Sequence, residues 1–77
     1  MFYVYVLRSK KTQELYYGYT NDLERRFSQH NKDNEWKLTY YEAYLAEEDA
    51  RKREGHLKQY GQSRTHLKNR IEKSIKV

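Results

Sequence analysis

The sequence predicts an α+β domain in which helices flank a short, mainly antiparallel three-stranded sheet, in the order ββαβαα. Three observations lead to this prediction. β-branched and aromatic residues gather in three separate stretches, as they do in strands. The segments that follow the second and third stretches carry apolar residues at helical spacing. Finally, 77 residues with no proline and no cysteine suit a single small domain over 1–77, without linker or repeat.

The first two strands are predicted to form a hairpin over residues 2–19. "FYVYVL" is β-branched and aromatic throughout, "RSKKTQ" is polar, and "ELYYGYT" resumes the strand pattern. Gly18 lies inside the second strand, where a glycine usually marks a bulge or the close approach of another group.

A helix is predicted to follow at once, over about 22–30. Asn21 is the expected N-cap, and Glu24 three residues later completes a capping-box pattern. Leu23 and Phe27 form the apolar stripe of this helix.

The remaining elements are a strand and two helices. The third strand is expected over about 38–44, within "WKLTYYEAYL". A long helix over 46–60 follows, and Gly61 stands where glycine commonly ends a helix. A last helix is predicted over 63–76. The expected inward faces of these two helices consist of Ala46, Ala50, Leu57, Tyr60, Leu67, Ile71 and Ile75.

The chain is basic, with a formal net charge of +5 and a pI near 9.5. Basic residues concentrate at 24–26 and from Arg51 onward. This charge fits a polyanionic partner such as nucleic acid, and it equally fits a basic protein without such a partner. No apolar stretch approaches the roughly 20 residues that span a bilayer, and no basic region precedes the first apolar run. We therefore expect no membrane span and no signal peptide, and a cytoplasmic location.

Glu54 falls on the expected apolar stripe of the long helix, four residues after Ala50 and three before Leu57. An ionised carboxylate at such a position needs a cation, a metal ion or strong hydrogen-bond donors. From periodicity alone, a structural ion pair with an arginine and a metal ligand both remain open.

Arg26 and His30 lie four residues apart, on the flank of the first helix's apolar stripe. A guanidinium can bind a phosphate through two hydrogen bonds, and a histidine can carry a proton. The structural alternatives are a solvated helix face for the arginine and a contact with the helix C-terminus for the histidine. His56 and His66 have no partner at a zinc-ligand spacing.

Tyr5 and Tyr16 lie on the two strands of the hairpin, where packing in the core is the ordinary role of a tyrosine. Two phenols, an arginine, a histidine and a carboxylate nevertheless form a set that suits phosphodiester hydrolysis. That reaction needs an activated water, a cation on the phosphate and a stabilised leaving group. One Mg²⁺ on one carboxylate is typical, because Mg²⁺ keeps most of its waters.

In these residues the sequence resembles the GIY-YIG nuclease superfamily, and within it the small stand-alone proteins related to the N-terminal domain of the bacterial excision-repair nuclease subunit. "YVY" at 3–5 stands where the family has Gly-Ile-Tyr, and "YYG" at 16–18 where it has Tyr-Ile-Gly. Arg26 follows Tyr16 by ten residues and His30 follows Arg26 by four, as in the family. Glu54 falls where the family keeps its metal-binding glutamate.

The resemblance covers residues 2 to about 60 and departs from the family pattern at two places. Tyr3 stands at the glycine of the first motif, and Tyr19 stands where some family nucleases have a lysine.

The resemblance implies a divalent-metal-dependent DNA endonuclease that acts in DNA repair or processing, with one Mg²⁺ (or Mn²⁺) bound by Glu54. It also implies that one of Tyr5 and Tyr16 assists deprotonation of the attacking water while the other orients it. Arg26 is expected to steady the phosphate, and His30 to hydrogen-bond within the centre.

DNA is the expected partner, bound with weak sequence preference through its phosphates. The expected additional contacts come from Arg25, Arg53 and Lys58, and from Asn69, the candidate for an asparagine that some members use beyond the glutamate. Two alternatives stay open. The first is a nucleic-acid-binding module that keeps the nuclease fold with little or no cleavage. The second is a protein-interaction domain that uses exposed aromatic residues.

Overall fold

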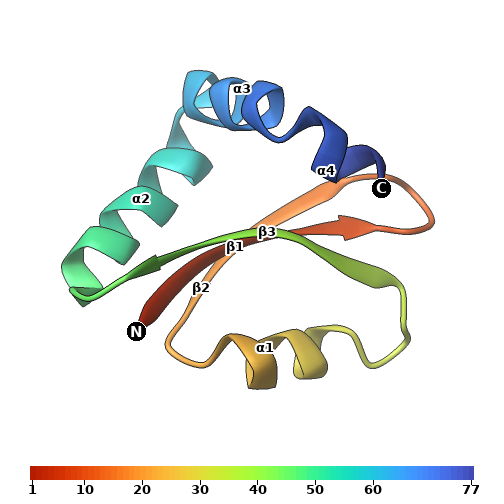
Figure 1. Cartoon of the computed structure of the whole chain (residues 1–77), viewed down its shortest axis with the longest axis horizontal. Coiled ribbons are helices and arrows are strands. Elements are labelled where there is room, and N and C mark those ends of the chain that lie inside the picture. Colours follow the sequence, from red (N-terminus) through yellow and green to blue (C-terminus); the bar gives the residue numbers. More distant parts are fainter.

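A computed structural model describes all 77 residues and has the predicted α+β architecture. The elements are β1 (Phe2–Ser9), β2 (Leu15–Thr20), α1 (Leu23–His30), β3 (Trp36–Tyr44), α2 (Glu47–Gln59), α3 (Gly61–Arg70) and α4 (Glu72–Lys76). The three strands form one antiparallel sheet in the order β2-β1-β3. Figure 1 shows the sheet as the middle layer, with α2, α3 and α4 on one side and α1 on the other.

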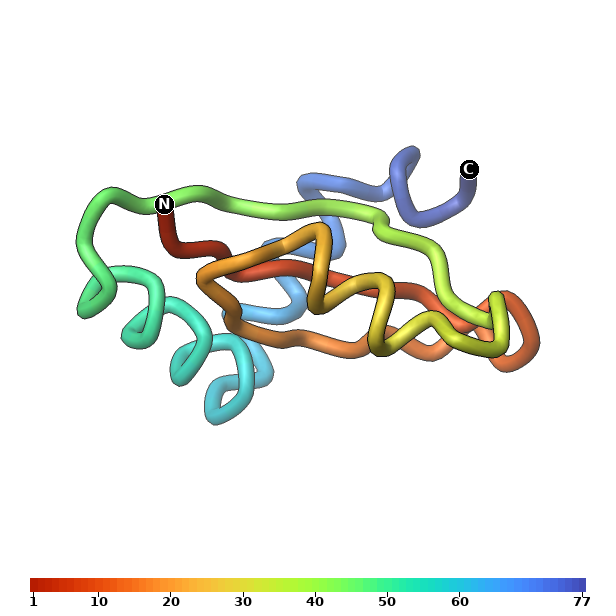
Figure 2. The backbone as a smooth tube through the Cα atoms, turned by 90° about the horizontal axis from the view of Figure 1, so that it is seen from below, coloured from red at the N-terminus to blue at the C-terminus, as the bar shows by residue number.

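The strand register divides the side chains between two faces. Tyr5 pairs with Gly18 and Leu7 pairs with Tyr16, so these four residues point to the α1 side. The residues between them point to the side of α2–α4. In Figure 2, which looks onto the sheet from the α1 side, α1 lies over β1, with β2 and β3 to either side. α1 therefore lies over the middle strand, and β2 keeps a free edge.

β3 contains an irregularity that keeps this division intact. Val6 pairs with Tyr40 and Leu7 with Leu38, which leaves Thr39 as an extra residue in β3. β3 begins at Trp36, two residues before the predicted start.

The hydrophobic core lies between the sheet and α2–α4. Its buried members are Val4, Val6, Ala50, Leu57, Leu67 and Ile71. Ala46 and Tyr60 are exposed, contrary to the prediction, because they flank α2 as its N-cap and C-cap and do not belong to its inward face. None of the helices is both long enough and apolar enough to cross a bilayer.

The predicted cap of α1 is wrong by one residue, because Asp22 and not Asn21 begins the helix. The Asp22 side chain accepts a hydrogen bond from the Arg25 backbone N–H at 3.2 Å. The Asp22 N–H in turn donates to the Thr20 hydroxyl at 3.0 Å, which fixes the turn between β2 and α1. Glu24 is therefore two residues past the cap and not at the capping-box position.

The predictions for the last two helices also need correction. Tyr60 is extended (φ −112°, ψ 114°) and separates α2 from α3, so Gly61 opens α3 and does not stop α2 in a left-handed conformation. The predicted helix over 63–76 is broken at Ile71 (φ −113°, ψ 28°). Ile71 belongs to the buried core, and after the break Ile75 packs against that core.

Candidate active site

The centre of the candidate site is the contact between Tyr5 and Gly18, which are paired across β1 and β2. A methyl group added to Gly18 would lie 2.9 Å from Tyr5 Cε1, and closer still to Cζ and the hydroxyl oxygen. The Tyr5 ring therefore passes directly over the glycine. Of the two alternatives that the sequence left open, the structure shows the close approach and not the bulge, because the register runs through Gly18 without interruption. Because β2 is an edge strand, the hydroxyl end of the ring reaches toward the free edge of the sheet.

The electrostatics of Tyr5 show which groups surround it. The side chain is 2% exposed, and burial raises the pKa of its phenol. Tyr16 raises this pKa further, Arg26 lowers it and Glu54 raises it. Three predicted site residues, from β2, α1 and α2, therefore influence the pKa of one hydroxyl group.

α1 contributes His30, whose ring packs against two aromatic rings, Tyr16 and Trp36. The His30 ring centroid lies 4.6 Å from that of Tyr16 and 4.8 Å from that of Trp36. Tyr16 is in turn 6.3 Å from Tyr5 between ring centroids. We call Tyr16, His30 and Trp36 the aromatic wall. The contacts with Tyr16 and Trp36 hold His30 beside the two tyrosines. His30 also lies in the last turn of α1, the position required by its structural alternative, a contact with the helix C-terminus.

Sequence reasoning missed Trp36 as part of the site. It is the chain's single tryptophan, and it stands at the first position of β3, opposite Ser9. The only signal in the sequence was its rarity, since the contact with His30 and Tyr16 depends on how β3 returns beside β1.

Arg26 is an exposed cation near Tyr5 that has no acidic partner. It belongs to none of the six ion pairs of the chain. Arg25 beside it pairs weakly with Asp22, at 3.6 Å and with both side chains exposed. Arg26 is therefore available to an anionic substrate, and a phosphate contact by Arg25 stays a prediction.

Glu54 reaches the site from α2, beside the edge strand. Its side chain is 22% exposed, and its one ion-pair partner is Lys58, whose Nζ lies 3.2 Å from Oε2. The arginine partner of the structural alternative is therefore not present. No group of three or more His, Cys, Asp or Glu side chains forms a metal-binding cluster in the chain. A cation at Glu54 would have one protein carboxylate and would take its other ligands from water and substrate, which suits Mg²⁺.

Arg53, the neighbour of Glu54, has a structural role. Its guanidinium binds the Glu42 carboxylate through Nε at 3.0 and 3.1 Å and through Nη2 at 3.0 Å. Glu42 also accepts hydrogen bonds from the hydroxyls of Tyr40 and Tyr44. Burial raises the pKa of Glu42, but these hydrogen bonds hold it below its usual value. This network joins β3 to α2 and speaks against the predicted phosphate contact by Arg53.

The other two predicted contacts lie in different places. Lys58 is part of the site through its pair with Glu54. Asn69 is exposed on α3 and lines a hollow of about 250 Å³ with residues 70–74. None of the candidate site residues Tyr5, Tyr16, Arg26, His30 and Glu54 lines this hollow. Its contact with nucleic acid stays a prediction.

Tyr19, at the position of the family's lysine, points to the α2 side. Its hydroxyl donates to Glu47 at 2.6 Å, and the Arg51 guanidinium lies 4.5 Å from the centroid of its ring. A cation of α2 thus stands beside this position although the lysine is missing.

Comparison with known proteins agrees with this geometry. The family model of the GIY-YIG catalytic domain matches residues 1–70. No curated protein and no solved structure was found to match. Because the family match takes in nearly the whole chain, including Tyr5, Tyr16, Arg26, His30 and Glu54, the protein belongs to the GIY-YIG catalytic-domain family and has its nuclease-type fold.

Proposed function

We propose that this protein is a divalent-metal-dependent DNA endonuclease, a phosphodiester hydrolase of DNA repair or processing. The observation that carries the proposal is the packing of Tyr5, Tyr16 and His30 on the α1 side of the sheet, next to an edge strand. Arg26 on α1 has no acidic partner, and Glu54 on α2 pairs only with Lys58. Membership of the GIY-YIG family supports the same class of reaction.

Arg26 is the phosphate-binding group in this proposal. Its guanidinium has no carboxylate to neutralise it, so it can bind the scissile phosphate through two hydrogen bonds. The same charge offsets the negative charge that grows on the phosphate as the fifth oxygen adds. His30, one turn later on α1, approaches the substrate from the same side.

The two tyrosines receive different roles because their environments differ. Tyr5 is buried, and its raised pKa keeps the phenol protonated at neutral pH, so it orients the attacking water as a hydrogen-bond donor. Tyr16 is 39% exposed and contacts the His30 ring. We therefore assign Tyr16 to the deprotonation of water: it accepts the water proton while its own proton passes to the imidazole.

Glu54 is the ligand for one divalent cation, Mg²⁺ or Mn²⁺. When bound, such a cation supplies positive charge to the phosphate and to the leaving oxygen. Glu54 fits this role because its only charged partner is Lys58, a flexible side chain that is 52% exposed and can turn toward a phosphate.

The substrate is DNA with weak sequence preference. Arg25, Arg26 and Lys58 are side chains that contact phosphates, and phosphate contacts carry no sequence information. Binding is expected to weaken steeply as the salt concentration rises, because phosphate contacts release counterions.

The experiment compares wild type, Glu54→Gln and Glu48→Gln on single-stranded, duplex and branched DNA, with Mg²⁺, Mn²⁺ or EDTA. Glu48 is an exposed carboxylate of α2 that makes no ion pair, so it controls for the loss of one charge from this helix. Wild type and Glu48→Gln should cleave only with metal, and Glu54→Gln should lose at least about 10²-fold in rate.

Unchanged cleavage by Glu54→Gln would refute the assignment of the metal ligand. Metal-independent binding of DNA by all three proteins, without cleavage, would instead favour the binding module that keeps the nuclease fold. Absence of DNA binding in low salt would exclude both the nuclease and the nucleic-acid-binding module. It would leave the protein-interaction domain as the remaining alternative.

A further inference from the structure

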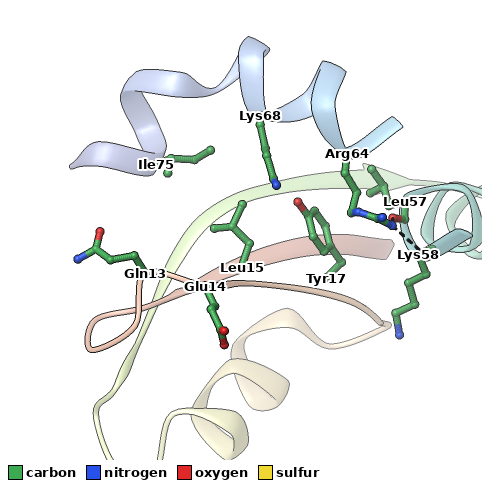
Figure 3. A pocket seen from close by; sticks show the side chains of 9 residues that line it. All are labelled: Gln13, Glu14, Leu15, Tyr17, Leu57, Lys58, Arg64, Lys68 and Ile75. Carbon is green, nitrogen blue, oxygen red and sulfur yellow. Dashed lines mark hydrogen bonds between the residues drawn. The ribbon is translucent and has the colours of Figure 1, made fainter. Parts of the chain in front are cut away.

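A second hollow lies on the α2–α4 side of the hairpin, between β2 and α3. Its volume is about 700 Å³. The hairpin supplies Leu15 and Tyr17, α2 supplies Lys58, and α3 supplies Arg64 and Lys68 (Figure 3). We call this hollow the β2–α3 groove. Nothing in the catalytic proposal uses its α3 side.

The β2–α3 groove has uncompensated positive charge. Arg64 and Lys68 belong to no ion pair of the chain. Arg64 donates from Nη1 to the carbonyls of Leu57 (2.8 Å) and Lys58 (3.0 Å), and this leaves the rest of its guanidinium free. Glu14 is the one acidic residue of the lining, and Figure 3 shows its carboxylate turned away from Arg64 and Lys68.

The floor of the groove carries an aromatic residue with an unsatisfied hydroxyl. Tyr17 Oη is buried and has no hydrogen-bond partner. Figure 3 shows this hydroxyl directed to α3, between Lys68 and Arg64. Burial raises the pKa of Tyr17, although Arg64 lowers it, so the hydroxyl remains a donor that lacks an acceptor. An anionic oxygen in the groove would provide one.

The groove is continuous with the candidate active site. Lys58 lines the groove, and its ammonium nitrogen lies 3.2 Å from the Glu54 carboxylate. Lys58 therefore connects the two regions, because its ammonium group pairs with Glu54 and its backbone carbonyl accepts a hydrogen bond from Arg64.

We propose that the β2–α3 groove binds a single-stranded segment of the DNA substrate on one side of the cleaved phosphate. The inference rests on the proposed function and adds a substrate class to it: DNA with unpaired nucleotides beside the cut, such as an overhang, a flap or a branch.

Three properties of the groove support this occupant. Arg64 and Lys68 are four residues apart on one helix, roughly 5–6 Å between Cβ atoms, a spacing similar to that of successive backbone phosphates. The volume is within the roughly 300–1,000 Å³ of small-ligand sites, which holds a short piece of one strand and not a duplex. A cationic groove with an aromatic ring is the arrangement by which proteins hold single strands.

The test measures binding of labelled DNA in EDTA, where no cleavage occurs, by fluorescence anisotropy. The probes are a blunt duplex and the same duplex with single-stranded tails of increasing length at the 5′ or the 3′ end. For wild type we expect a tail of one polarity to tighten binding at least about tenfold, up to a plateau after a few nucleotides.

Lys68→Glu should abolish this gain. Lys73→Glu is the matched control, since Lys73 is an exposed lysine of α4 that lies outside the groove and makes no ion pair. It makes the same change in net charge and should keep the gain. Lys68→Ala, with circular dichroism of all variants, separates loss of the groove from loss of the fold.

The outcomes separate this inference from the proposed function. If wild type cleaves or binds DNA but tails give no gain, the groove is not a single-strand site, and the nuclease proposal stands. If Lys68→Glu and Lys73→Glu behave alike, the effect belongs to net charge and the groove assignment is wrong. If wild type neither binds nor cleaves any of these DNAs, the proposed function itself fails.

Discussion

The two faces of the sheet are built from different residues and serve different purposes. The face toward α2–α4 packs valines against Leu57, Leu67 and Ile71 in one aliphatic cluster. The face toward α1 carries Tyr5 and the aromatic wall, and α1 itself has no buried residue. The first face supplies most of the burial that stabilises a small domain. The second face also buries Tyr5 and Leu7, but it leaves Tyr16 and the unpaired Arg26 exposed, where a substrate can reach them.

The largest expected effect separates the two faces by stability. Leu57 is 0% exposed, so Leu57→Ala should lower the free energy of unfolding by about 2–5 kcal/mol. Phe27→Ala, in the half-buried stripe of α1, should cost less than about 2 kcal/mol, because α1 buries little. Urea titrations of both variants give the comparison. Equal losses would show that α1 is as much a part of the core as α2.

The second prediction is that a residue of the α1 side contributes much to cleavage and little to stability. Arg26→Ala should reduce the rate of cleavage by about 10²–10³-fold, because it removes the charge on the scissile phosphate. The exposed side chain makes no ion pair, so unfolding should change by no more than about 0.5 kcal/mol.

Arg25→Ala is the matched control for that experiment. It has the same charge and helix, and it should weaken DNA binding while the turnover of bound DNA is retained. A loss of turnover in Arg25→Ala equal to that in Arg26→Ala would mean that α1 acts through its total charge and not through one arginine.

The sequence predicted the α1 side of the sheet better than it predicted the ends of the helices. The order of strands and helices follows from residue spacings within single elements. The family motifs pointed to the candidate site residues Tyr5, Tyr16, Arg26, His30 and Glu54. The caps do not, because Asn21 and Asp22 are equally good N-cap residues. The choice between them depends on the Thr20 hydroxyl, which accepts from Asp22 N–H.

The contacts that link distant elements were also out of reach. The position of Trp36 against His30 depends on how β3 pairs with β1, and the break at Ile71 depends on the core surface that α4 must meet. The Glu54–Lys58 pair is different, because both residues lie on α2 at an i,i+4 spacing that is visible in the sequence, although the prediction considered only an arginine as the ion-pair partner.

The third prediction concerns Gly18, which lies beneath the Tyr5 ring on the α1 side of the sheet. In Gly18→Ala the new methyl group would overlap the Tyr5 ring, so the ring must move. We expect a stability loss of about 1–3 kcal/mol and a clear fall in cleavage rate. The double variant Gly18→Ala with Tyr5→Leu should recover much of the stability, as urea midpoints would show, and none of the activity. Failure to recover would mean that the glycine is needed for the backbone of β2 and not for Tyr5.

The smallest expected effect is an alkaline weakening of the α2–α4 face. Folding raises the pKa of five tyrosines, and four of them, Tyr17, Tyr19, Tyr40 and Tyr44, point to that face. Burial and the hydrogen bond to Glu42 raise the pKa of Tyr44 to about 12. Above about pH 10 the unfolded tyrosines lose protons that the folded ones keep. The unfolded state then binds fewer protons, so the free energy of unfolding falls as pH rises from about 10 to 12.

Urea midpoints at pH 8 and pH 11 measure this fall in wild type and in Tyr44→Phe. The variant also loses a hydrogen bond to Glu42 at pH 8, so the informative quantity is the difference between the two pH values and not the stability itself. That difference should be smaller in Tyr44→Phe than in wild type. Tyr16→Phe is the control from the α1 side, because Tyr16 lies outside the hydrogen-bond network of Glu42. An equal reduction in both variants would mean that alkaline weakening arises from the total charge of the chain and not from the network that joins β3 to α2.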